Sequence, residues 1–106
     1  MTSFNEREKA FEDKYKHDQE LQFKVEVRRN KLLGLWAAEL LGLTGADADA
    51  YAKEVITVDF DEPGVDDVVR KVCADLSGKN IDVSEHRLHK KIEELTDVAK
   101  QQIMNE

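Results

Sequence analysis

Apolar residues recur at helical spacing along most of the chain, and they are densest between Lys31 and Leu43. In that run leucine, alanine and tryptophan side chains would surround almost the whole helix, and Glu39 is the one charged residue inside it. A helix with so little polar face is normally enclosed by other elements. It is too short to cross a bilayer, which needs about 20 apolar residues. We therefore expect a small helical domain packed around this segment.

The first helix is predicted to begin near Ser3, which forms a capping box with Glu6, and to end near Leu43. Its expected apolar stripe consists of Leu21, Val25, Leu32, Trp36 and Leu43, widened by Phe23 and Val27. Gly34 lies inside this helix, where glycine is less favourable than alanine by about 1 kcal/mol. We expect another helix to pass close to the chain at this glycine.

A second helix is predicted from the Thr44 and Gly45 turn, with Thr44 as its N-cap, to about Phe60. Its inward face would consist of Ala48, Tyr51, Ala52 and Val55. The run from Val55 to Val58 is β-branched and has strand propensity. Because the sequence offers no second strand to pair with it, we predict that this run is helical.

The break at Pro63 and Gly64 starts a third helix, with an apolar face from Val65 to Leu76 and an end at Gly78. The fourth begins near Asp82 or Ser84, and its face consists of Leu88, Ile92, Leu95, either Val98 or Ala99, and Ile103. Short connections favour antiparallel neighbours. The predicted fold is all-α: a four-helix bundle-like domain over residues 18–106, with a long first helix.

The N-terminal segment, residues 1–17, has a different pattern. Phe4, Phe11 and Tyr15 form a narrow aromatic stripe on an otherwise charged segment. Isolated helices of this length are marginal in water, so we predict a weakly attached arm that is mobile or a frayed helix. The alternative is that the segment is simply the solvated start of the first helix.

Charge and cysteine content narrow the class of protein. The net charge is −7, and residues 32–69 carry nine acidic groups against one lysine, which argues against nucleic acid as a partner. Arg28, Arg29 and Lys31 form a small basic cluster that we interpret as a solvated helix face. The single Cys73 and the charged N-terminus, which does not match a signal peptide, favour a cytoplasmic protein without membrane insertion.

The sequence contains no recognisable catalytic or metal-binding constellation. His86 and His89 are three residues apart, but no third ligand follows at a matching spacing, so we expect surface histidines and no metal site. No glycine-rich phosphate loop is present. The apolar neighbours of Cys73 argue against an activated nucleophile and favour a small packing residue. We therefore expect that the protein is not an enzyme.

Several motifs resemble a known family in the same order along the chain. They are Phe4, the run REKAFE from Arg7, His17 with Asp18, RRNKLLGLWAAE from Arg28, LGLTG from Leu41, YAKEV from Tyr51 and KIEEL from Lys91. Together they resemble the zeta subunit family, the alpha-proteobacterial inhibitors of F-type ATP synthase. The run from Arg28 is the most specific, because a glycine, a tryptophan and two arginines match at fixed places.

The resemblance implies a four-helix fold and an N-terminal inhibitory segment that enters an interface of the catalytic sector and blocks ATP hydrolysis. The implied partners are the alpha, beta and gamma subunits, and the protein would lie in the cytoplasm, peripheral to the inner membrane through ATP synthase. The residues expected to contact the enzyme are Phe4, Arg7, Glu8, Phe11 and Tyr15. No cofactor is required, although the family implies weak ADP or ATP binding at an unknown site.

Two other functions remain open at this stage. The chain could be a small nucleotide-sensing or ligand-binding helical domain in which the arm is incidental. It could also be an oligomeric scaffold assembled through the apolar first helix. The inhibitor hypothesis instead predicts that the free protein is a monomer.

Overall fold

The structure, a computed structural model, describes the backbone of residues 2–58 and 64–106 and the side chains of residues 19–58 and 64–106. These ranges contain four helices: α1 (Thr2–Leu40), α2 (Gly45–Val58), α3 (Asp66–Gly78) and α4 (Glu85–Met104). The all-α, four-helix architecture with a long first helix is therefore confirmed. The predicted second-helix end at Phe60 lies outside the described residues. The third helix begins at Asp66, three residues after the predicted start at Pro63.

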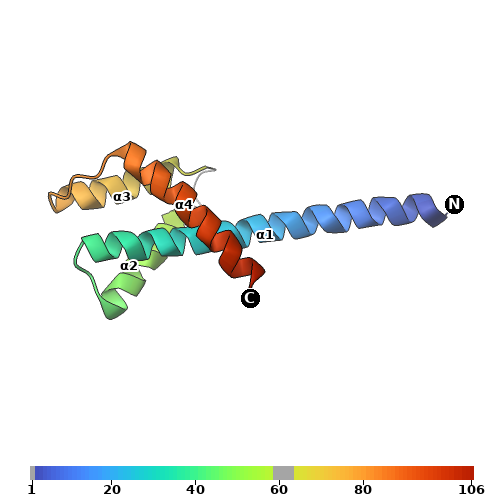
Figure 1. Cartoon of the computed structure of the whole chain (residues 1–106), viewed down its shortest axis with the longest axis horizontal. Helices are drawn as coiled ribbons and strands as arrows, with labels where there is room; N and C mark the ends of the chain where they lie inside the picture. Colours follow the sequence, from blue (N-terminus) through green and yellow to red (C-terminus); the bar gives the residue numbers. More distant parts are fainter. Residues whose placement is uncertain (1, 59–63) are drawn as a thin grey trace.

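The long helix α1 organises the molecule. It contacts each of the other three helices, and α3 also contacts α2 and α4. These three helices gather around the C-terminal half of α1, while its N-terminal half extends beyond them, giving extents of 66 × 25 × 21 Å (Figure 1). Because α1 is continuous through residues 17 and 18, no helix break marks the predicted arm boundary, and that division stays a prediction.

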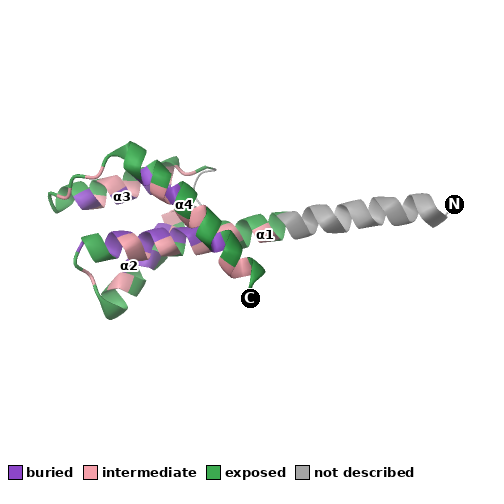
Figure 2. Ribbon diagram, viewed as in Figure 1, coloured by how far each residue is buried: buried purple, intermediate pink, exposed green. Residues whose placement is uncertain are grey.

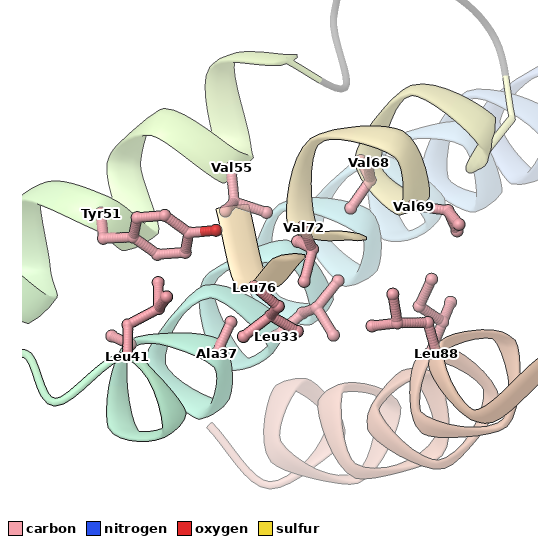
Figure 3. Close-up of a cluster of buried hydrophobic side chains, with 12 residues drawn as sticks. Leu33, Ala37, Leu41, Tyr51, Val55, Val68, Val69, Val72, Leu76 and Leu88 are labelled. Carbon is pink, nitrogen blue, oxygen red and sulfur yellow. The ribbon is translucent and has the colours of Figure 1, made fainter. Parts of the chain in front are cut away.

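The core lies where all four helices meet, at the end of the molecule opposite the N-terminus (Figure 2). Figure 3 shows buried side chains from the four helices pointing toward one another, with Leu33 of α1 among them. The largest fully buried apolar side chains are Leu33, Leu76, Leu88, Val55, Val68 and Val72. All of these except Leu33 come from the predicted apolar faces of α2, α3 and α4, so those faces are confirmed.

The buried face of α1 differs from the predicted stripe. The predicted residues Leu21, Val25, Leu32, Trp36 and Leu43 are only half-buried. The buried positions are instead Arg29, Asn30, Leu33, Gly34, Ala37, Ala38 and Leu41. The predicted stripe was chosen from the large apolar side chains. The buried face differs because small residues allow the backbone of a neighbouring helix to come closest. Nor is the segment enclosed on all sides, since Leu40 is 38% exposed.

Gly34 marks the point of closest approach between α1 and α2. A Cβ atom added there would lie 2.6 Å from the Cα atom of Ala52, which is closer than two carbon atoms can pack. The expectation that a helix passes close to this glycine is confirmed, and the helix is α2.

Two helices, α1 and α3, end in the same backbone motif. After α1, Gly42 adopts a positive φ of 78°, and the N–H of Leu43 donates to the carbonyl of Ala38 at 2.8 Å. After α3, Asn80 takes the same role with φ 61°, and the N–H of Ile81 donates to the carbonyl of Leu76 at 2.9 Å. Both arrangements are Schellman motifs. The predicted end of the third helix at Gly78 is confirmed. The first helix ends at Leu40, three residues before the predicted Leu43, because the motif at Gly42 stops it earlier.

The structure of α4 decides between the alternatives that the sequence left open for the start and the inward face of the fourth helix. Ser84 is the N-cap, and its side-chain oxygen accepts a hydrogen bond from the N–H of Arg87 at 3.1 Å. Ala99 is buried, whereas Val98 is 38% exposed, so the inward face of α4 contains the alanine.

Candidate functional site

The candidate site begins with the N-terminal part of α1, because this part of the helix extends away from the other three (Figure 1). The residues expected to contact a partner, Phe4, Arg7, Glu8, Phe11 and Tyr15, lie on it. Their side chains lie outside the described residues, so their predicted role stays a prediction. What the structure does describe is the base of this segment, where α1 meets the end of α4.

At the base, Arg28 ties α1 to the end of α4. Its Nη1 atom donates to Oε1 of Gln102 at 2.9 Å, and its Nη2 atom forms an ion pair with Glu106. The neighbouring Arg29 is 8% exposed, and its Nε atom donates to Oδ1 of Asn30 at 3.1 Å. The prediction that Arg28, Arg29 and Lys31 form a solvated face is therefore wrong for the two arginines, and only Lys31 is exposed. The contacts of Arg28 with α4 help to fix the direction in which α1 leaves the bundle.

Beside this ion pair lies a groove between α1 and α4, which we call the basal groove. Its volume is about 430 Å³, and its apolar lining consists of Leu21 and Val25 of α1 with Ile103 and Met104 of α4. Its polar lining consists of Gln22, Glu26, Arg29, Thr96 and Lys100. Ile103 also lines a second hollow, which contains Phe23 of α1. Met104 is 82% exposed and Phe23 is 53% exposed. The base of the projecting helix thus presents apolar side chains to solvent.

A polar cluster fastens α2 to α3 on another side of the molecule. The hydroxyl of Tyr51 donates to Oδ2 of Asp75 at 2.8 Å, and Nζ of Lys71 lies 3.2 Å from the same carboxylate and 3.3 Å from Glu54. The Lys71 ammonium also lies 5.4 Å from the centre of the Tyr51 ring. Each polar group in the cluster has a partner of complementary charge or hydrogen-bonding character, which indicates a structural role.

The pKa shifts in this cluster follow from burial and charge. Burial raises the pKa of Tyr51, and the hydrogen bond and negative charge of Asp75 raise it further. Burial alone would lower the pKa of Lys71, but hydrogen bonds to Asp75 and Glu54 outweigh it, so the pKa is raised. Both groups therefore keep their protons at neutral pH and hold the cluster in one charge state.

The other residues considered for chemistry lie apart from the basal groove. Cys73 is half-buried against the core, and burial, with a smaller contribution from the charge of Glu85, raises the pKa of its thiol. Such a thiol is a poor nucleophile, as the sequence predicts. His86 and His89 are exposed, and the described residues contain no group of three or more potential metal ligands. None of the described helices combines the length and apolar character needed to span a membrane.

The sequence analysis missed the basal groove, although it noted its members. Leu21 and Val25 belong to the predicted apolar stripe of the first helix, and Ile103 belongs to the predicted face of the last. The groove arises because the last turn of α4 crosses α1 there, and sequence spacing within one helix does not show where another helix crosses it.

Comparisons with known proteins agree with the architecture. The family model described as ATPase inhibitor subunit zeta matches residues 1–102, which include both the projecting segment and the bundle. A structure determined by solution NMR is 53% identical to this chain, and the match covers 80% of this chain and 96% of that one, with a TM-score of 0.72. The comparison with curated proteins gives no match.

Proposed function

This chain belongs to the ATPase inhibitor subunit zeta family, and from that premise we propose that it inhibits ATP hydrolysis by F-type ATP synthase through insertion of residues 1–17 into the catalytic sector. In this proposal the segment enters an interface formed by the alpha, beta and gamma subunits. The bundle remains outside because it is too wide to follow. The protein acts as an inhibitor and not as an enzyme.

The observation that carries the proposal is the shape of α1. The helix runs for 39 residues, about 58 Å at 1.5 Å per residue. The described core residues all lie at or after Arg29, so the bundle is built on the C-terminal part of this helix. A helix that starts far beyond its own core is suited to enter a groove in another protein.

The sequence spacing of the proposed contacts supports the same conclusion. Relative to Phe4, the residues Arg7, Glu8, Phe11 and Tyr15 follow at i+3, i+4, i+7 and i+11. This spacing places all five positions on one face of a helix. Burial of the three aromatic side chains would contribute on the order of 1.5–3 kcal/mol each, before the free energy needed to order the segment is subtracted. The free energy that remains after this subtraction is compatible with reversible inhibition.

The test measures ATP hydrolysis by the purified catalytic sector while the inhibitor is titrated. We expect the full chain to inhibit and the truncated chain, residues 18–106, to be inactive while circular dichroism shows that it is still helical. Undiminished inhibition by the truncated chain would overturn the proposal.

A second variant keeps the full chain length. Replacing Phe4, Phe11 and Tyr15 together by alanine removes the aromatic stripe and should abolish inhibition. The matched control replaces Lys9 and Asp13, which the sequence spacing places on the opposite side of the same helix, and it leaves the net charge unchanged. This control should inhibit like the natural sequence, and equal inhibition by both variants would contradict the proposed contact face.

A further inference from the structure

We infer that the basal groove is a second contact site for the catalytic sector, which receives an apolar side chain from the rim of the interface that the N-terminal segment enters. The inference rests on the proposed function, because it takes the insertion of residues 1–17 as its premise. It adds a surface of the bundle that binds the enzyme, so the bundle would do more than remain outside the interface.

The first argument is the chemistry of the surface. Among the described residues, the large apolar side chains that are notably exposed are Phe23, Leu40, Val98 and Met104, and two of these four lie at the base of the projecting helix. Single exposed apolar residues are common on proteins, but Met104 and Phe23 flank hollows that share Ile103. Exposed apolar side chains that are gathered in one place and bordered by charged residues are typical of a contact site, and methionine adapts well to the shape of a partner.

The second argument is position. Leu21 is four residues beyond the end of the proposed arm, which corresponds to about 6 Å along a helix. When residues 1–17 are inserted, the groove must therefore stand at the mouth of the interface. Insertion of a rigid helix would bring the basal groove against the rim of the catalytic sector. The groove would therefore continue the proposed interface directly.

The third argument is rigidity at the base. Arg28 joins α1 to Gln102 and Glu106, at the two sides of Ile103 and Met104 in the sequence. These bonds hold the last turn of α4 against α1, so the two walls of the groove are fixed relative to the inserted helix. A preformed surface loses less conformational entropy on binding than a mobile one.

The experiment compares two glutamine variants of the full chain in the same hydrolysis titration. Met104→Gln changes the groove, and Val98→Gln is the matched control, because Val98 is exposed on the same helix and lines neither the basal groove nor the second hollow. We expect Met104→Gln to raise the concentration needed for half-inhibition by about tenfold, as the loss of one buried apolar side chain would. Combining it with Phe23→Gln should raise this concentration further, whereas Val98→Gln should leave it unchanged.

The natural chain and the chain of residues 18–106 are titrated alongside. If the natural chain inhibits, the truncated chain does not, and Met104→Gln equals Val98→Gln, the groove inference alone is overturned. If the truncated chain inhibits fully, the proposed function itself is overturned. Sedimentation of the free proteins tests whether a second copy of the chain occupies the groove instead. If Met104→Gln lowers the sedimenting mass and leaves inhibition unchanged, a second copy fills the groove and the inference is overturned.

Discussion

Gly34 shows how one residue sets the spacing of two helices. Its missing side chain allows the backbone of Ala52 to pack directly against α1, and this contact defines the crossing of α1 and α2. We predict that Gly34→Ala destabilises the protein by about 1–2 kcal/mol, because overpacking outweighs the gain in helix propensity. Thermal unfolding measures the effect as a fall of several degrees in Tm.

The matched control is the same substitution in α3. A Cβ atom at Gly78 would meet nothing within 4 Å, and this glycine has an ordinary helical φ. Gly78→Ala should therefore leave the Tm unchanged or raise it. Two variants with equal Tm values would show that α2 can move away from α1 at little cost.

Tyr51 provides a prediction that depends on pH. Its hydroxyl donates to Asp75, and Tyr51→Phe should lower the free energy of unfolding by about 1–2 kcal/mol at pH 7. Because the pKa of Tyr51 is raised in the fold, tyrosine ionises first in the unfolded chain, at its ordinary value near 10. The stabilisation is therefore complete below pH 10 and is lost as the pH rises beyond it.

Urea unfolding of both proteins at pH 7, 9 and 10.5 provides the measurement. The difference between the natural chain and Tyr51→Phe should be constant from pH 7 to 9 and smaller at pH 10.5. A difference that stays constant up to pH 10.5 would show that the hydroxyl is not held neutral by its surroundings.

At the scale of elements, periodicity identified the helices well, but it placed the end of α1 and the packing face of α1 poorly. The faces of α2, α3 and α4 are confirmed because each has one apolar stripe. For α1 the large residues Leu32 and Trp36 indicated a stripe that is only half-buried, while Gly34 and Ala37 make the close contacts. Small residues carry little hydrophobic signal, so their packing role depends on which helix approaches them.

The N-cap of α4 is the element feature most open to a direct test. Ser84 accepts a hydrogen bond from the N–H of Arg87, and its replacement by alanine should lower the free energy of unfolding by about 1 kcal/mol. Ser84→Asp restores an acceptor and should retain the natural stability. If the alanine variant is as stable as the natural chain, water satisfies the first turn of α4 equally well.

At the scale of the whole molecule, the two halves of α1 lie in different surroundings (Figure 1). The C-terminal half carries the core, while the first half extends the molecule along its 66 Å axis. The division between an inhibitory arm, residues 1–17, and the domain that follows stays a prediction that rests on the sequence resemblance, since periodicity in residues 1–17 left open a solvated helix start. The basal groove could not be predicted from the sequence, because it depends on the crossing of α4 over α1.

The central claim is that residues 1–17 enter the catalytic sector, and site-specific photocrosslinking tests it most directly. A benzoylphenylalanine at position 11 of the full chain, mixed with the catalytic sector during ATP hydrolysis, should crosslink to the alpha or beta subunit. The same group at the exposed position 98 should not. Crosslinks from position 11 that form only within its own chain, while hydrolysis is inhibited, would contradict the account.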